Sequence, residues 1–304
     1  MLVVNAGSTS LKLSVVDAGE ASTKVESLQA VPSGVGAIGH RVVHGGSRFR
    51  EPVVVDDDVK RALHELEPLA PLHNRVALDG IAEARRRLPD VPHVAVFDTA
   101  FHATIPGEAA TYALPRRWRD SFGVRRYGFH GLSVAWAASQ IRVPRLVVCH
   151  LGGGCSVSAV RDGRSVDTTM GFSPLEGVPM ATRSGSVDPG ALLYLMREHG
   201  LSVEELDRAL EKESGLAALG GLDTPLGFGV YTYRVAQAVA AMAAALAGLD
   251  VIVFSGGVGE NRADVREAVV TRVRFLGDFR VEVVAAREDV IIARGVRTLL
   301  SATR

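Results

Sequence analysis

LVVNAGSTSLKLSVVDAG (residues 2–19) recurs later in the chain as LVVCHLGGGCSVSAVRDG (residues 146–163). The two stretches align without a gap and share six identities in eighteen positions. In each, two runs rich in β-forming residues flank a polar turn, which predicts a β-hairpin. Two valine-rich hairpins can look alike by chance, but a repeat 144 residues apart favours two duplicated domains.

Strands and helices alternate along the rest of the chain. The run HVAVF at residues 93–97 predicts a short buried strand, and the polar Asp98 directly after it occupies a favoured site position. Asp188 before Pro189 predicts the start of a helix. The remaining expected elements are helices at 57–66, 74–88, 233–247, 261–274 and 288–300, and strands at 250–254 and 280–284. Mixed hairpins with alternating strands and helices predict an α/β fold.

Composition limits the classes of partner. The 304 residues carry 34 basic and 34 acidic side chains, a net charge of zero and two cysteines. This length predicts about two domains. The charge balance disfavours nucleic acid or an anionic membrane as a partner. The longest apolar run, residues 238–249, is too short to cross a bilayer, and residues 1–10 lack the pattern of a secretory signal. We therefore expect a cytoplasmic protein.

Three glycine-containing loops each follow an apolar strand: NAGSTS (residues 5–10), HLGGG (150–154) and SGGVGEN (255–261). Backbone N–H groups in such loops can surround phosphate oxygens. A tight turn is the alternative for any one loop, but three loops favour a phosphate site. The sequence has no P-loop pattern, and Arg262 stands where a dinucleotide fingerprint has its third glycine. A P-loop site and a Rossmann site are therefore both disfavoured.

Eight motifs make the sequence resemble the acetate kinase family, a branch of the superfamily that includes sugar kinases and actin. They are NAGSTSLK (5–12), GHRVVHGG (39–46), APLHN (70–74), VFDTAFH (96–102), RRYGFHGLS (125–133), CHLGGG (149–154), MATRSGSVDPG (180–190) and SGGVGEN (255–261). A ninth segment, AREDVIIAR (286–294), is similar to the family's C-terminal T-N-E-E segment. The resemblance implies two duplicated ribonuclease-H-like domains, each a mixed sheet flanked by helices, with the active site in the cleft between them.

The resemblance also implies a domain division and an activity. Residues 1–101 with 288–304 would form the N-terminal acyl-substrate and phosphate domain, and residues 102–287 the nucleotide-binding and dimerisation domain. The implied reaction is reversible phosphoryl transfer from ATP to acetate or another short-chain fatty acid, giving ADP and acyl phosphate. Mg²⁺ or Mn²⁺ would be the cofactor. The expected partners are the carboxylate, the nucleotide and a second copy of the chain in a homodimer.

The implied catalytic roles fit the chemistry of the residues. Arg41 would orient the substrate carboxylate, while Arg183 and His130 would stabilise the transition state. A carboxylate acceptor is already ionised and needs no general base, so Asp98 would position an arginine or a metal-bound water. The alternatives are a solvated surface charge for an arginine, a hydrogen-bonded core histidine for His130 and a turn cap for Asp98.

The family pattern extends to ligand-binding residues. Asn5 and Glu288 match the metal ligands, and their oxygens suit a hard cation. The pocket for the acyl methyl group would consist of Val43, Leu72, Phe129 and Pro174, for which ordinary core packing is the alternative. The nucleotide-binding set would be Ser8, Ser10, Lys12, His150, Leu151, Gly152, Gly153, Gly154, Asp223, Gly257, Val258, Gly259, Glu260 and Asn261.

The nucleotide side departs from the family pattern. The chain is shorter than usual for the family, most clearly between Gly215 and Tyr233, where relatives carry an S-x-D-x-R segment that helps to hold the nucleotide. Here GGLDTPLG offers Asp223 and then Pro225, so the arginine contact is missing and Arg262 is a candidate replacement. Three alternatives stay open: another phosphate donor such as pyrophosphate, an alcohol acceptor with Asp98 as its base, and a non-catalytic regulatory homologue.

Overall fold

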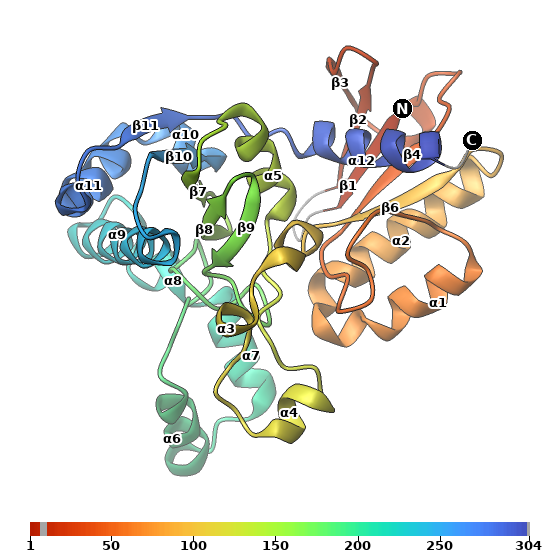
Figure 1. Ribbon diagram of the computed structural model, residues 1–304. Coiled ribbons are helices and arrows are strands. Elements are labelled where there is room, and N and C mark those ends of the chain that lie inside the picture. Colours follow the sequence, from red (N-terminus) through yellow and green to blue (C-terminus); the bar gives the residue numbers. More distant parts are fainter. Residues whose placement is uncertain (7–10, 303–304) are drawn as a thin grey trace. The chain divides into compact units, whose positions relative to one another are not determined.

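The computed structural model describes residues 1–6 and 11–302, and its chain divides into two compact units (Figure 1). Unit 1 consists of Met1–Ala103, Phe129–Trp136 and Arg287–Arg304, and unit 2 of Thr104–Gly128 and Ala137–Ala286. The chain passes between the units four times, and one of these passages lies inside helix α5 (Gly131–Gln140).

Unit 1 is built on a six-stranded sheet with the order β3-β2-β1-β4-β6-β5. Strands β1, β2 and β3 are antiparallel neighbours, whereas β1, β4 and β6 run parallel. The strands are β1 (Leu2–Ala6), β2 (Leu11–Val16), β3 (Ser22–Val25), β4 (Ile38–Val42), β5 (Val53–Val54) and β6 (His93–Phe97). The helices are α1 (Asp57–Glu65), α2 (Pro71–Arg87) and α12 (Glu288–Ala302), with single 3₁₀ turns at Leu28–Ala30, Glu67–Leu69 and Ala100–Thr104.

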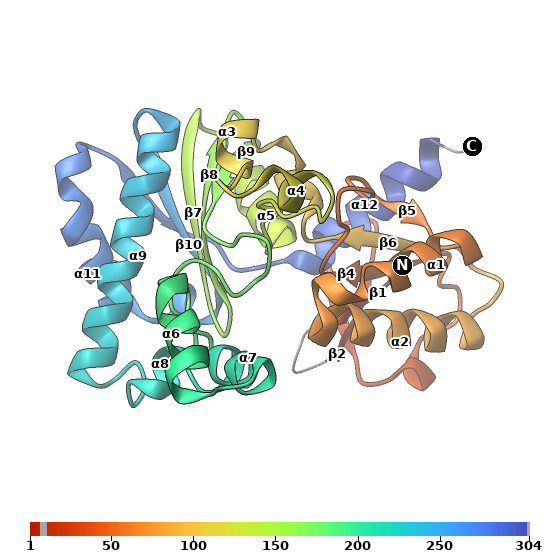
Figure 2. The same ribbon diagram turned by 90° about the horizontal axis from the view of Figure 1, so that it is seen from below.

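Helices cover both faces of this sheet, as Figure 2 shows for α2 and α12. Successive side chains of a strand point to opposite faces, so β1 serves two cores. Leu2 and Val4 pack with Ala84 of α2. Val3, between them, packs with Ile292 of α12. Because both faces are buried, β1 and β6 are nearly continuous apolar runs.

Unit 2 is built on a five-stranded sheet with the order β11-β10-β7-β8-β9. Its strands are β7 (Arg145–Leu151), β8 (Cys155–Arg161), β9 (Arg164–Thr168), β10 (Val251–Ser255) and β11 (Arg280–Val283). The helices are α3 (Gly107–Ala110), α4 (Arg116–Asp120), α6 (Pro189–His199), α7 (Val203–Lys212), α8 (Gly215–Ala218), α9 (Pro225–Leu246), α10 (Gly256–Asn261) and α11 (Ala263–Val273), with a 3₁₀ turn at Arg274–Leu276. Helix α9 packs on β7, β8 and β9.

The two sheets repeat one strand pattern. In unit 1, β1 pairs antiparallel with β2 and parallel with β4. In unit 2, β7 pairs antiparallel with β8 and parallel with β10. The sequence repeat therefore corresponds to equivalent hairpins, and the predicted α/β fold of two duplicated domains is confirmed.

Three local predictions were wrong or incomplete. SGGVGEN was expected to be a loop, but Gly256–Asn261 forms helix α10 directly after β10. Gly256 makes this sharp entry possible with a φ of +79°, which glycine adopts without strain. The helix expected at 233–247 begins at Pro225, where the Thr224 side chain accepts a hydrogen bond from the Gly227 N–H. Strand β4, which carries Arg41, was not predicted.

Candidate active site

Arg41 and Asp98 form a buried ion pair in unit 1. Parallel pairing of β4 with β6 sets Arg41 opposite Val96, so that Asp98 follows the end of the neighbouring strand. Nε of Arg41 donates to both Asp98 carboxylate oxygens at 3.0 and 3.1 Å, and Nη2 donates to Oδ2 at 2.5 Å. The side chains are 13% and 1% exposed. This fork fixes the guanidinium plane of Arg41.

Burial dominates the electrostatics of this pair. Burial raises the pKa of the Asp98 carboxyl, and the adjacent Arg41 guanidinium opposes that rise. Burial also disfavours the charged form of Arg41, but Asp98 and Glu288 together raise its pKa above the ordinary value. Arg41 therefore stays a cation in a site shielded from water, with its charge balanced by Asp98 and Glu288.

Asn5 and Glu288 complete the cluster from the two ends of the chain. Asn5 lies in β1 and Glu288 is the first residue of α12. The Asn5 side chain accepts from Nη1 of Arg41 at 3.1 Å and donates to Oε2 of Glu288 at 2.9 Å. Nη1 of Arg41 also lies 3.5 Å from Oε2 of Glu288. Four predicted site residues of unit 1 are thus in direct contact.

The same cluster fits a hard divalent cation. The side chains of Asn5 and Glu288 converge and offer amide and carboxylate oxygens, the donors that Mg²⁺ prefers while it keeps several waters. Within residues 1–6 and 11–302, no group of three or more His, Cys, Asp or Glu side chains is placed to hold a metal ion. A site of one or two protein ligands completed by water and phosphate is the kind that these residues could form.

Ser133 is a site residue that the sequence motifs did not single out. Its hydroxyl donates to Oε1 of Glu288 at 2.7 Å, and the residue is 1% exposed. Ser133 lies in α5, within the segment RRYGFHGLS, so its motif was recognised but its role was not. The bond fixes one carboxylate oxygen of Glu288 and leaves the other toward Asn5.

His130 lies at the strained entry to α5. Its φ is +58°, a left-handed conformation that is uncommon outside glycine. The His130 carbonyl accepts from the Val134 N–H at 3.0 Å, and the next residue, Gly131, donates to the Asp98 carbonyl at 3.0 Å. A Cβ on Gly131 would lie 2.0 Å from the Asp98 carbonyl oxygen, so only glycine fits there. The chain thereby holds the His130 backbone close to that of Asp98.

The proposed acyl-pocket residues are divided between the units. Val43 and Phe129 are buried in unit 1, at 4% and 1% exposed. The ring of His44 meets the edge of Phe129, with ring centroids 5.4 Å apart. Leu72 lies in α2, and its side chain is outside what the structure describes. Pro174 is buried in unit 2.

Arg183 in unit 2 is held by an acidic partner that the sequence did not reveal. Nε of Arg183 donates to Oε2 of Glu211 at 2.8 Å, and the two side chains are 13% and 14% exposed. Nη1 of Arg183 donates to the Pro174 carbonyl at 3.4 Å. Glu211 lies near the end of α7, far in sequence from any recognised motif. A lone glutamate in an amphipathic helix carries no sequence signal for such a role.

The two described glycine segments of unit 2 differ from the expected open loops. His150 and Leu151 belong to β7, and the Gly152 N–H donates to the Gly154 carbonyl at 3.0 Å. In α10, Glu260 accepts from the Gly256 N–H at 2.9 Å. The other predicted residues of these segments are Gly153, in the turn after β7, and Gly257, Val258, Gly259 and Asn261, all in α10. Ser8 and Ser10 lie outside the described residues, and Lys12 is exposed opposite Asn5.

Asp223 and Arg262 are brought together across the shortened segment. Nη1 of Arg262 donates to Oδ1 of Asp223 at 2.8 Å, and the Asp223 side chain is 89% exposed. Arg262 also donates to both carboxylate oxygens of Asp264 at 2.9 and 2.8 Å. Unit 2 thus contains an Asp–Arg pair, but its two residues lie in separate segments of the chain and not in one S-x-D-x-R motif.

Comparison with known proteins settles the family. The model of the acetokinase family matches residues 23–302. This chain belongs to the acetokinase family. An acetate kinase from Synechococcus sp. (strain JA-2-3B'a(2-13)) is 45% identical over 312 residues, which cover 88% of this chain and 77% of that protein. An acetate kinase from Deinococcus deserti is 47% identical and covers 88% of this chain and 72% of that protein.

Solved structures of the family are similar over nearly the whole chain. A propionate kinase from Francisella tularensis subsp. tularensis SCHU S4 has a TM-score of 0.88 and 31% identity, covering 97% of this chain and 98% of that one. An acetate kinase from Porphyromonas gingivalis has a TM-score of 0.83 and 31% identity, covering 98% and 99%. This acetokinase-family chain spans about two thirds to three quarters of the length of the curated relatives that it matches. Among its described residues, no helix combines the length and apolar character needed to span a bilayer.

Proposed function

We propose that this protein is a carboxylate kinase that transfers a phosphoryl group reversibly between ATP and acetate or another short-chain fatty acid. The observation that carries the proposal is the fixed Arg41 guanidinium, which is held by Asp98 and Asn5 beside Glu288 in a chain of the acetokinase family. A rigid cationic fork matches the planar carboxylate of such a substrate.

The roles of the charged residues follow from the chemistry of the acceptor. Acetate is ionised near neutral pH, so the nucleophilic oxygen needs positioning rather than deprotonation. Arg41 binds the carboxylate, and Asp98 holds Arg41 in place. Arg183 and His130 stabilise negative charge on the transferring phosphoryl group. The side chains of Val43, Leu72, Phe129 and Pro174 enclose the alkyl group of the acid.

A bound Mg²⁺ or Mn²⁺ would neutralise charge on the phosphate oxygens of the donor. Asn5 and Glu288 would hold it, because their side chains already lie together in unit 1. Ser133 orients Glu288 through its hydrogen bond to Oε1.

The nucleotide would be bound by the glycine-containing segments at 150–154 and 257–261 with Ser8, Ser10 and Lys12. Asp223, supported by Arg262, would contact the nucleoside end. We further propose a cytoplasmic homodimer that associates through residues 102–287. In this proposal, residues 1–101 and 288–304 carry the acyl and phosphate site, and residues 102–287 bind the nucleotide.

Hydroxylamine trapping tests the proposal. The protein is incubated with Mg²⁺, ATP and acetate, propionate or butyrate, and acyl hydroxamate is measured by its iron complex. We expect product with at least one acid. The absence of product with all three acids, across ATP, GTP and pyrophosphate as donors, would exclude a carboxylate kinase. Product with pyrophosphate alone would keep the acceptor chemistry and replace the donor.

A further inference from the structure

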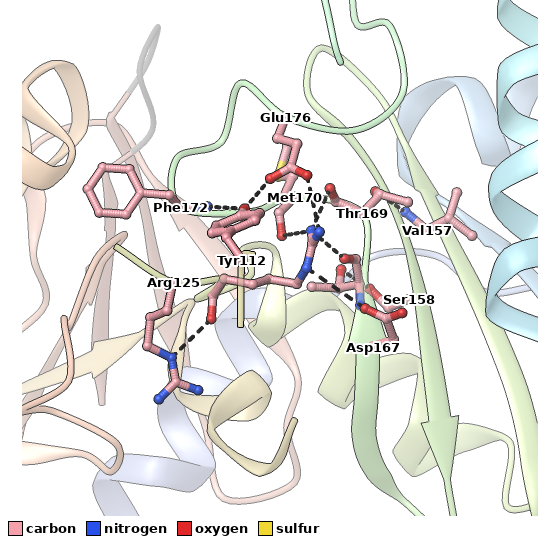
Figure 3. A network of polar contacts seen from close by, with 11 residues as sticks. Tyr112, Arg125, Val157, Ser158, Asp167, Thr169, Met170, Phe172 and Glu176 are labelled. Carbon is pink, nitrogen blue, oxygen red and sulfur yellow. Dashed lines mark hydrogen bonds and ion pairs between the residues drawn. The ribbon is translucent and has the colours of Figure 1, made fainter. Parts of the chain in front are cut away.

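Figure 3 shows a polar network in unit 2 that includes Tyr112, Asp167 and Glu176. The network centres on Arg126, a residue for which the family resemblance suggested no role. Its side chain is 16% exposed. Nη1 donates to three consecutive carbonyl oxygens, those of Thr168 at 2.9 Å, Thr169 at 3.1 Å and Met170 at 3.2 Å. One guanidinium therefore holds the chain where it leaves strand β9.

Arg126 also holds the far end of the same segment. Its Nη2 donates to Oε1 of Glu176 at 3.1 Å. The Tyr112 hydroxyl donates to the other carboxylate oxygen of Glu176, and the Phe172 N–H donates to the Tyr112 oxygen at 3.0 Å. Burial raises the pKa of Tyr112, so the hydroxyl keeps the proton that it donates. Both ends of residues 168–176 are thus joined through Arg126 and Tyr112.

Gly171 shows how tightly this segment is packed. Its carbonyl accepts from the N–H groups of Tyr127 and Gly128 at 3.0 and 3.3 Å. A Cβ on Gly171 would lie 1.6 Å from Oε2 of Glu176 and 2.0 Å from the Tyr112 oxygen. Any larger residue at position 171 must therefore displace the Tyr112–Glu176 contact.

The segment that Arg126 fixes contains Pro174. The Pro174 side chain is one wall of the proposed acyl pocket, and its carbonyl accepts from Nη1 of Arg183 at 3.4 Å. We propose that Arg126 is a positioning residue for residues 168–176 that determines, through Pro174, the length of the acyl group accepted by the enzyme. This inference rests on the proposed carboxylate kinase activity. It adds a specificity determinant that does not itself touch the substrate.

Arg126 itself is a poor residue to remove. Its loss would leave the Glu176 carboxylate without its guanidinium partner and three carbonyls without their donor, and such variants often fail to fold. Tyr112→Phe is a milder change, because it keeps the ring and removes only the hydroxyl that joins Glu176 to Phe172. Gly171→Ala disturbs the same contact from the backbone side. Tyr127→Phe is a matched control, since it removes a hydroxyl that donates to the Gly123 carbonyl outside the segment.

The kinetic test compares kcat/KM for acetate, propionate and butyrate in each variant. A displaced pocket wall changes the discrimination between acids that differ by one methylene, and we expect the acetate-to-propionate ratio to change about tenfold in Tyr112→Phe and Gly171→Ala. KM for ATP should stay near that of the wild type. Tyr127→Phe should keep the wild-type ratio. If both test variants lower kcat/KM equally for all acids, the network is merely structural and the inference is wrong.

Hydrogen–deuterium exchange separates this inference from the proposed activity. Peptides covering residues 168–176 should lose protection in Tyr112→Phe and retain it in Tyr127→Phe, whether or not the enzyme turns over. Unchanged protection in Tyr112→Phe would overturn the positioning role. The wild-type protein could also make no acyl phosphate while Tyr112→Phe and Tyr127→Phe still differ in exchange. That result would refute both the proposed activity and the acyl-specificity claim, and leave only the structural role of the network.

Discussion

Replacing Asp98 by Asn perturbs the contact that orients Arg41. The change keeps the shape of the side chain but removes its charge and sets an amide against the guanidinium. Breaking a buried ion pair typically costs about 3–5 kcal/mol of unfolding free energy. In this variant Glu288 is still close to Arg41, at 3.5 Å, whereas Asp98 lies at 2.5 Å in the wild type. Because Coulomb energy is inversely proportional to distance, the attraction of Arg41 to Glu288 is about seven tenths of its attraction to Asp98. We therefore expect a loss near the lower bound, about 3 kcal/mol.

The effect on catalysis should be larger than the effect on stability. A guanidinium displaced by about 1 Å can lower the rate about 10²-fold, so kcat/KM for acetate should fall by about that factor. Urea unfolding and steady-state kinetics measure the two losses. Asp250→Asn is the matched control, because Asp250 forms a similar fork with Arg145 at 3.0 and 2.5 Å in unit 2, away from the proposed site. If Asp98→Asn keeps wild-type kcat/KM, Arg41 does not depend on Asp98 for its position and the reasoning fails.

Three further predictions concern other residues. Ser133→Ala should weaken Mn²⁺ binding, measured by electron paramagnetic resonance without substrates, about tenfold or more, because Glu288 loses the bond that orients it; unchanged binding would contradict this. Glu211→Gln should lower kcat about tenfold and leave KM for acetate unchanged, since Arg183 acts on the transferring group; an effect confined to KM would refute that role. Burial lowers the pKa of His102 to about 4 from 6.5, so the folded state excludes a proton that the unfolded chain binds. The contribution of neutral His102 to the free energy of unfolding is therefore complete above pH 6.5. Between pH 6.5 and about 4 it falls by about 1.4 kcal/mol per pH unit. Urea titrations at several pH values should show a smaller slope in His102→Asn.

The duplicated hairpins were predictable because their signal is local. Runs of β-forming residues on either side of a polar turn mark a hairpin without knowledge of the rest of the chain, and β1 pairs with β2 and β7 with β8 as expected. Strand β4 gave no such signal, because Ile38–Val42 contains Gly39, His40 and Arg41. Gly39 is required there by α12, since its Cβ would lie 2.6 Å from Ile292. That constraint comes from a residue more than 250 positions away.

The candidate site also contains residues that the sequence motifs reveal and residues that they do not. Asn5, Arg41, Asp98 and Glu288 lie in motifs that can be read from the sequence, and the structure brings them into contact. Ser133 and Glu211 could not be assigned, because a serine in a helix and a glutamate in an amphipathic helix usually serve as ordinary surface or packing residues. Their roles depend on tertiary contacts alone.

The central claim is that a carboxylate oxygen attacks the phosphoryl group, and ³¹P NMR with ¹⁸O-labelled acetate tests it directly. The labelled acid is incubated with ATP and Mg²⁺, and the phosphorus resonances are followed. We predict an acyl phosphate resonance that carries the isotope shift of a bridging ¹⁸O and grows as ADP appears. Inorganic phosphate as the only new product, formed at a rate independent of acetate, would contradict the account.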